Sequence, residues 1–402
     1  MSVLDDRAAR PLGTGAQYLR KVHFVGSLPP EIAVDGLAAQ DYFLARTVGA
    51  ELTGLPGGED PRWIINYLES LPGRRPFEDE ATDYNGLPDL GPFETVREGD
   101  SADYDSMPVV RFRAGHRPDP RDFLLGREQE VRERFEERRI KGAKGLAPHQ
   151  VTIPSPFDLG LFVFGVPAAM ERQLAVGDAL GALRSFWRYR KLVTEAITQE
   201  IALCQEIAEE FGDRIIFQLE SPAVLVGFDR TPAVAWPAVA RMLARITAEV
   251  IMASPARSRF VLHGWCYGDL GHKPISGLHD LKPMVAFMNR LAWTLQMAGR
   301  AIPPLHFAVC DGQNTPPVDR EHYLPLRDLR ADVRVYAGVA DEKAIGDSHK
   351  ALPLIEQELR RPVDAVAAAC GLGRRTPKQA EDNIALTLQL AAAPILVGSN
   401  YD

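Results

Sequence analysis

Three of the four cysteines in this chain stand at the ends of stretches with the composition of β-strands: Cys266, Cys310 and Cys370. Each is followed by Gly or by a polar turn. If parallel strands close into a barrel, their carboxyl ends form one rim, so thiols far apart in sequence converge there. Convergent thiolates bind zinc, which keeps them deprotonated at neutral pH. We therefore predict a metal or reactive-thiol site, the alternative being that these are small hydrophobic core residues, as we predict for Cys204 in mid-helix.

The segment around Cys266 carries three more side chains of the kinds that bind metals. They are His263, Asp269 and His272. Side chains alternate between the two faces of a strand, so His263 is expected to face away from Cys266 unless Gly264 forms a β-bulge. We therefore predict His263 as a metal ligand if the bulge is present, with Asp269 and His272 as substitutes.

Strand-like and helix-like patterns alternate along most of the chain, and this alternation must position the rim residues. Strands are expected at 21–27, 49–55, 150–154, 214–220, 260–263, 305–310, 333–339 and 363–370. Helices are expected at 31–48, 178–211, 233–253, 279–299, 348–360 and 377–391. Strands separated by helices pair in parallel, and eight of them favour closure into a barrel. The predicted fold is therefore α/β, a single (β/α)8 TIM barrel.

The predicted barrel spans residues 19–402, after a flexible N-terminus at 1–18. A long insertion at 73–145 follows the second strand, because Pro and Gly interrupt the regular pattern there. It contains a short strand at 109–114 and a run of mixed charges at 127–144, which we interpret as a solvated helix. We expect this helix to be a surface arm or a contact in a homo-oligomer, with a substrate lid as the alternative.

Composition narrows the classes of protein to which the chain can belong. Of the 402 residues, 46% are hydrophobic, and no apolar run of about 18 residues is present to cross a membrane. The formal net charge of −8 disfavours a nucleic-acid partner. The first twenty residues lack an apolar signal core, and four cysteines in a reducing compartment indicate thiols or metal ligands rather than disulfides. We expect a cytoplasmic enzyme with a small-molecule substrate.

Two other polar groups near the rim are assigned structural roles. His306 precedes Cys310 by four residues on the same strand, roughly 13 Å by strand rise, which is too far for a shared metal. We predict that it is a hydrogen-bonded interior histidine. Asp341-Glu342 ends the seventh strand and is predicted to cap the next helix, with proton transfer as the alternative.

Short motifs at five strand ends occur in an order that is more specific than any one of them. They are Val25-Gly26-Ser27 with the prolines that follow, Gly58-Glu59 with Arg62, Gln218-Leu219-Glu220-Ser221-Pro222, Trp265-Cys266-Tyr267, and Cys370-Gly371-Leu372. Together they resemble the catalytic half of cobalamin-independent methionine synthase, in the uroporphyrinogen-decarboxylase-like superfamily. The resemblance extends along the rim from the first strand to the last.

The resemblance implies a barrel that holds zinc on a His, two Cys and a Glu, and that activates an amino-acid thiol for methyl transfer. Cys266 and Cys370 match the family's two cysteine ligands. Cys310 falls where the family has its Glu ligand, and His263 stands one position before the place of the family's His. The expected metal ligands are therefore His263, Cys266, Cys310 and Cys370. The expected catalytic residues are Cys266, Cys370 and Asp269.

The resemblance also implies where the substrate lies. Glu59 and Glu220 match positions that hold the substrate amino group, and Ser27 matches one that holds its carboxylate. Arg374 and Arg375 follow Cys370 at the mouth of the barrel, where an arginine suits a carboxylate or a phosphate. As alternatives, the glutamates are ordinary solvated or capping acids, and the arginines are surface charges.

The leading hypothesis is zinc-dependent transfer of a methyl or other alkyl group to the thiol of a homocysteine-like small molecule. Coordination to zinc lowers the pKa of the substrate thiol, so that the thiolate can attack the alkyl donor. One alternative is a metal-free lyase or decarboxylase that uses rim arginines against substrate carboxylates. Another is a degenerate barrel that serves as a binding protein. The sequence identifies neither the donor nor the acceptor.

Overall fold

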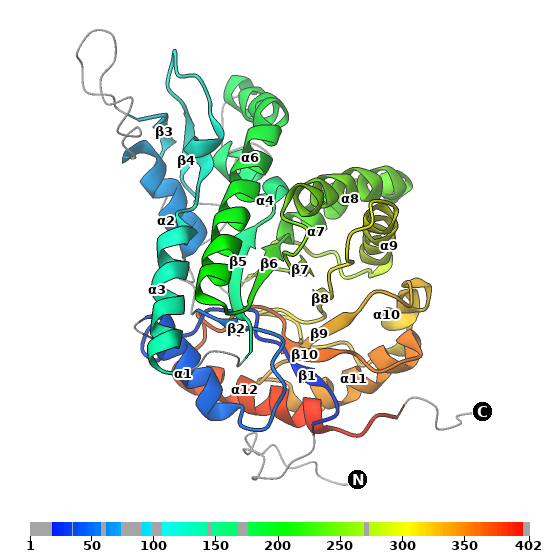
Figure 1. The fold of residues 1–402 in the computed structure, drawn as a ribbon. Coiled ribbons are helices and arrows are strands. Elements are labelled where there is room, and N and C mark those ends of the chain that lie inside the picture. Colours follow the sequence, from blue (N-terminus) through cyan, green and yellow to red (C-terminus); the bar gives the residue numbers. More distant parts are fainter. Residues whose placement is uncertain are drawn as a thin grey trace.

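The centre of the molecule is a sheet of eight parallel strands surrounded by helices (Figure 1). This computed structural model describes residues 18–33, 35–57, 62–73, 91–98, 107–142, 147–167, 176–268 and 273–396. Across the sheet the order is β1 (Lys21–Val22), β10 (Ala365–Ala368), β9 (Val335–Ala340), β8 (Leu305–Ala308), β7 (Phe260–Trp265), β6 (Ile215–Glu220), β5 (His149–Pro154) and β2 (Leu55–Pro56). Every one of these strands overlaps a strand predicted from the sequence.

The two edge strands of this order approach each other. Val22 and Leu52 form a parallel bridge, in which Val22 N donates to Glu51 O at 2.9 Å and Thr53 N donates to Val22 O at 3.0 Å. The sheet is therefore curled. The α/β class and the parallel eight-stranded sheet are confirmed, and the curl is consistent with a TIM-like barrel.

Helices follow the strands along the chain. They are α1 (Gly36–Arg46), α4 (Pro156–Val163), α6 (Val176–Phe211), α7 (Pro222–Asp229), α8 (Trp236–Ala253), α9 (Lys282–Met297), α10 (Arg320–Tyr323), α11 (Ile345–Leu359) and α12 (Pro377–Ala392). The sequence did not predict α4 or α7, because each is short and largely apolar and so lacks an amphipathic period. No helix in the described part of the chain has the length and apolar character to span a membrane.

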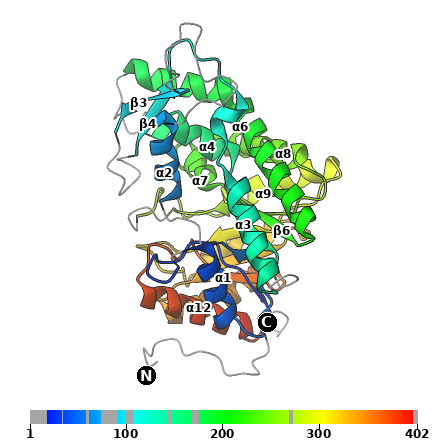
Figure 2. The same ribbon diagram turned by 60° about the vertical axis from the view of Figure 1, so that its left-hand side comes forward.

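Between β2 and β5 the described chain forms α2 (Trp63–Ser70), a hairpin of β3 (Phe93–Arg97) and β4 (Val109–Phe112), and α3 (Arg127–Ile140). Both views show the hairpin beside the N-terminal part of α6, projecting beyond the sheet (Figures 1 and 2). The charged segment is a helix, as predicted, but it is not solvated on all sides. Phe135 is buried, and Arg138 forms a buried ion pair with Asp213 at 2.8 Å. The mixed charges of α3 gave no sign of this buried face in the sequence. An arginine can be buried when a carboxylate is paired with it.

Alternation along the strands separates an outer apolar face from an inner face that becomes polar toward the carboxyl ends. Phe217 and Leu262 belong to the main core under the helices. Ile216 and Val261 belong to a small separate cluster with Tyr336 and Ala365 on the other face of the sheet. The next positions on that inner face, two residues further along β6 and β7, are Gln218 and His263, both fully buried. The fold therefore collects polar side chains at the carboxyl end of the sheet interior.

Candidate metal site

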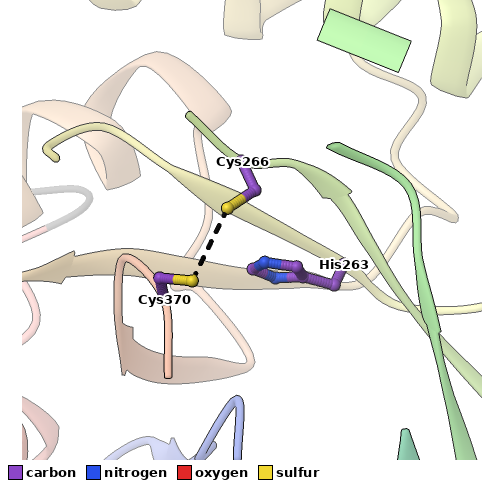
Figure 3. A group of neighbouring side chains, drawn as sticks. All are labelled: His263, Cys266 and Cys370. Atoms are coloured by element: carbon purple, nitrogen blue, oxygen red, sulfur yellow. Dashed lines mark hydrogen bonds between the residues drawn. The ribbon is translucent and has the colours of Figure 1, made fainter. Parts of the chain in front are cut away.

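Three side chains that could bind a metal ion lie together at the carboxyl ends of β7 and β10: His263, Cys266 and Cys370 (Figure 3). Their ligand atoms all lie within 4.8 Å of one another. The Sγ atoms of Cys266 and Cys370 are 3.8 Å apart, and Gly268 N donates to Cys266 Sγ at 3.3 Å. Within the described ranges, no other cluster of His, Cys, Asp or Glu side chains has this compactness.

A β-bulge in β7 brings His263 and Cys266 to the same side. The pairing of β7 with β8 shifts its register directly after His263, so Gly264 is the extra residue. A side chain at Gly264 would crowd the core, since a Cβ there would lie 2.9 Å from Leu262 Cγ. The β-bulge on which the prediction for His263 depended is therefore present, and His263 faces the interior with no exposed surface.

The His263 imidazole has one nitrogen in a hydrogen bond and one without a partner. Nδ1 lies 2.6 Å from Nδ1 of His306, whereas Nε2 is buried and has no hydrogen-bond partner among the described residues. Burial lowers the pKa of His263 well below its usual value, and the neighbouring His306 and His23 lower it further. The ring is therefore neutral at pH 7. A buried lone pair without a partner is costly, and metal coordination would satisfy it.

The Cys266 thiol is neutral in this arrangement. Its hydrogen bond to Cys370 raises its pKa well above the usual value, and burial and the charge of Cys370 raise it further. The charge of Glu220 acts in the same direction, and Glu220 on β6 is the register partner of His263. One imidazole nitrogen and two sulfur atoms form a donor set that zinc prefers, and a bound cation would convert the thiols to thiolates.

Cys310 lies outside this compact group, but it lines a small cavity that Cys266 and Cys370 also line. Its thiol donates to Gly338 O at 3.8 Å, and burial raises its pKa well above the usual value. The cavity has a volume of about 10 Å³, room for about one water-sized atom. Its walls include Cys266, Cys370 and Arg375. Three of the four predicted ligands are thus grouped, and the fourth lies in the wall of the adjoining cavity.

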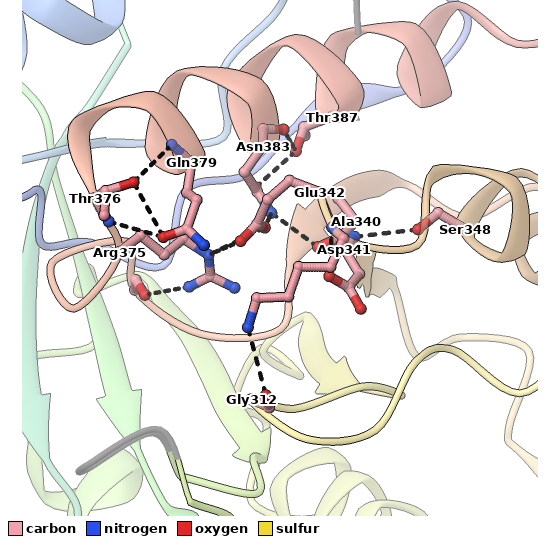
Figure 4. Close-up of polar contacts among 12 residues, drawn as sticks. Gly312, Ala340, Asp341, Glu342, Ser348, Arg375, Thr376, Gln379, Asn383 and Thr387 are labelled. Carbon is pink, nitrogen blue, oxygen red and sulfur yellow. Dashed lines mark hydrogen bonds and ion pairs between the residues drawn. The ribbon is translucent and has the colours of Figure 1, made fainter. Parts of the chain in front are cut away.

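The loop that carries Cys370 is held on one side by a buried polar network (Figure 4). Arg375 Nη1 donates to Gly371 O at 3.1 Å, and Arg375 Nε donates to Glu342 Oε1 at 2.9 Å. Asn383 Nδ2 donates to Glu342 Oε2 at 2.8 Å, and Asn383 is itself buried. The network connects the end of β9 to α12 and to the backbone directly after Cys370.

Ser27 holds the same loop from another side. Its Oγ accepts from Gly373 N at 3.1 Å, and its carbonyl accepts from Leu372 N at 3.1 Å. The approach is close, since a Cβ at Gly371 would lie 2.4 Å from Ser27 Oγ. Ser27 has a φ of 21°, which is rare for a residue other than glycine and stores strain. Its contact with the loop is shown, and its role toward a substrate carboxylate remains a prediction.

The other predicted site residues are placed less directly. Glu220 Oε1 accepts from Gln218 Nε2 at 3.0 Å. Of the two adjacent arginines, Arg375 borders the cavity and Arg374 is not among the described residues of its wall. Three predicted residues lie outside the described residues: Glu59, Asp269 and His272.

Sequence reasoning missed two contacts and misassigned a pair of acids. His306 is a buried hydrogen-bonded histidine as predicted, but its contact with His263 was not foreseen, although the strand register that aligns the two would have revealed it. The contact of Arg375 with Glu342 was missed as well. The helix-cap prediction for Asp341-Glu342 is wrong, because the N-cap of α11 is Ala344 and makes no side-chain cap.

Comparison with known proteins adds little beyond shape. No family model matches the chain, and no curated protein matches it. Among solved structures, the chain is similar to a methyltransferase from Methanosarcina mazei, with 13% sequence identity and a TM-score of 0.46 over 94% of each chain. A likeness this distant defines neither a family nor an activity.

Proposed function

We propose that this protein is a zinc-dependent enzyme that transfers a methyl or other alkyl group to the thiol of a homocysteine-like small molecule. The observation that carries the proposal is the buried Nε2 of His263, which lacks a partner among the described residues and lies in one group with two cysteine thiols. Three protein ligands leave a fourth position on zinc for a substrate atom. The rim motifs that resemble cobalamin-independent methionine synthase favour alkyl transfer as the reaction.

His263, Cys266 and Cys370 would hold the ion, and the small cavity beside them would receive the substrate sulfur. A zinc ion bound there would lower the pKa of a coordinated thiol, so that a thiolate would be available at neutral pH to form the new sulfur–carbon bond while the bond from that carbon to the donor breaks. Cys310 and Arg375 border that cavity, so they would lie beside the reacting sulfur. Space for about one water-sized atom suits the sulfur itself and excludes bulk water from it.

We further infer that the sheet closes into a (β/α)8 barrel through the bridge between Val22 and Leu52. On the other side of β1, which pairs with β10, the bond from Gly373 N to Ser27 Oγ joins the loops that follow these two strands. Ser27 would then hold the substrate carboxylate beside the metal.

The remaining substrate contacts are proposed from their predicted places on the rim. Glu59 and Glu220 would hold the substrate amino group, Arg374 would bind an anionic group, and Asp269 would take part in catalysis. The register pairing of Glu220 with His263 supports the placement of that residue near the reacting centre.

Metal analysis of four single variants tests the proposal: Cys204→Ala, Cys266→Ala, Cys310→Ala and Cys370→Ala. We expect about one zinc per chain in the untagged wild type and in Cys204→Ala, which removes a buried cysteine on α6, and loss of zinc in Cys266→Ala and Cys370→Ala. Retention in Cys310→Ala would show a three-residue ligand set, and loss would add Cys310 as a fourth ligand.

A wild type that holds no zinc and cannot be loaded with it would contradict the proposal. The cavity wall with Arg375 would then favour the metal-free lyase or the binding protein. If zinc is present, the loaded enzyme should be screened with small thiols against methyl donors, with Cys266→Ala as the inactive control.

A further inference from the structure

The imidazole of His263 is hydrogen-bonded to a second imidazole on the neighbouring strand. His263 on β7 and His306 on β8 are register partners. Their rings are stacked, with centroids 4.6 Å apart and an angle of 24° between the planes, and the two Nδ1 atoms are 2.6 Å apart. Neither ring has exposed surface. Water therefore does not compete for this hydrogen bond.

The other nitrogen of His306 determines the direction of that hydrogen bond. His306 Nε2 lies 3.0 Å from Ala368 O, and a carbonyl oxygen can only accept, so Nε2 carries the proton. The ring is fully buried, which disfavours its charged form, and a neutral imidazole carries only one N–H, so its Nδ1 is bare. His306 Nδ1 must then accept from His263 Nδ1–H. The neutral His263 ring consequently has its lone pair on Nε2.

A glycine on the intervening strand leaves room for this arrangement. Gly338 lies on β9, between the strands that carry His306 and Ala368. A Cβ at Gly338 would lie 2.9 Å from His306 Nε2. The ring can therefore reach across β9 to β10. Ala368 precedes Cys370 by two residues, so the chain of hydrogen bonds ends beside the loop that carries that thiol.

We propose that His306 is a positioning residue that holds His263 in the Nδ1–H tautomer and thereby directs the Nε2 lone pair toward the two thiols. The tautomer itself follows from the hydrogen bonds, and its consequence for metal binding rests on the proposed zinc site. Metal-binding histidines commonly donate their second nitrogen to a carbonyl or a carboxylate, which sets the tautomer and ring orientation. In this chain the acceptor is a neutral histidine, His306, which in turn donates to Ala368 O. His306 thus connects the strand of one proposed ligand to the strand end of another.

Nitrogen NMR of the metal-free protein labelled with 15N-histidine tests the tautomers directly. We expect His263 to be protonated at Nδ1 and bare at Nε2, and His306 to show the opposite pattern. The spectra of His263→Gln and His306→Asn identify the two sets of signals. Finding His263 protonated at Nε2, or at both nitrogens, at pH 7 would overturn the proposal, whether or not the protein binds zinc.

Zinc affinity of the variants provides the second readout. We expect His306→Leu to weaken zinc binding by about 10- to 100-fold, because His263 loses the acceptor that orients it. His306→Asn places an amide oxygen near the position of Nδ1, so it should restore affinity to within a few-fold of wild type. His149→Leu is the matched control, because His149 is another buried interior histidine, on β5, and its Nδ1 lies 3.0 Å from Gln40 Nε2.

The outcomes separate the two proposals. A wild type that binds no zinc removes the proposed function, and the tautomers still decide the role of His306. If His306→Leu binds zinc as tightly as the wild type does, the positioning role is excluded and the zinc site is retained. If His306→Leu does not fold, the wild-type tautomers and the His306→Asn variant give the decision.

Discussion

Two polar groups contribute to the wall of one small cavity, the first through Arg375 and the second through Cys266 and Cys370, and they differ in whether their hydrogen bonds are complete. In the first, Arg375 is paired with Glu342, and Glu342 also accepts from Asn383. In the second, which consists of His263, Cys266 and Cys370, the sulfur atoms contact each other and His263 Nε2 has no partner within the described chain. The charges of the network are paired with each other, whereas the neutral group has one nitrogen that a ligand could still bind.

The difference follows from the cost of burying charge. A buried guanidinium must have its carboxylate beside it, because the free energy of removing either ion from water is large. Neutral thiols and a neutral imidazole cost less, so they can be buried with an open position. We infer that the network of Arg375 and Glu342 supports the Cys370 loop, and that the neutral group is where a ligand binds.

The strongest test of this difference between the two groups removes one charge from the network. Glu342→Gln should lower the free energy of unfolding by about 3 kcal/mol, because the largely buried Arg375 loses the carboxylate with which it is paired. Zinc stoichiometry should stay near one per chain. Denaturant unfolding and metal analysis measure the two quantities. Glu381→Gln is the control, since Glu381 is 56% exposed in its ion pair with Arg46 and should cost less than about 1 kcal/mol. Equal effects of the two substitutions would show that the network does not support the fold.

The neutral group should respond to pH in a way that the network does not. Because the pKa of Cys266 is raised in the metal-free protein, a proton must leave before zinc binds, and acid therefore favours release of the metal. Loss of the Cys266 proton should raise the affinity by up to about tenfold per pH unit, and a second proton lost from Cys370 would make the rise about a hundredfold. Competition with a chromophoric chelator between about pH 6 and pH 8 measures this slope. Cys266→Asp should give a shallower slope, and an affinity independent of pH would exclude thiol ligands.

The smallest effect is expected at Ser27, which contacts the loop without belonging to either group. Ser27→Ala should cost about 1 kcal/mol of stability, because Gly373 N loses its acceptor. Ser27→Gly should be no less stable than Ser27→Ala, since glycine adopts the φ of 21° without strain. Thermal unfolding of the pair measures this difference. A Ser27→Ala variant of unchanged stability but weakened substrate binding would instead make Ser27 a substrate contact.

The sequence by itself determined the series of elements and the convergence of thiols on one end of the sheet. Both depend on local information: strand and helix periods are visible in single segments, and parallel pairing then aligns the carboxyl ends. All eight strands overlap a predicted strand, although β2 does so only at Leu55, and the helices α6, α8, α9, α11 and α12 were predicted within a few residues. So were the strand ends that carry Cys266 and Cys370, which lie 104 residues apart in the chain.

The tertiary structure alone decided which side chains meet. His263 joins Cys266 only because Gly264 forms a bulge, and a shift of one residue in a strand reverses the face to which every side chain points. His306 was too distant by its own strand, yet strand pairing places it against His263. Arg375 rather than Arg374 reaches the cavity because of the path of the loop between β10 and α12. Contacts between strands depend on register and side-chain direction, which arise only when the whole sheet packs.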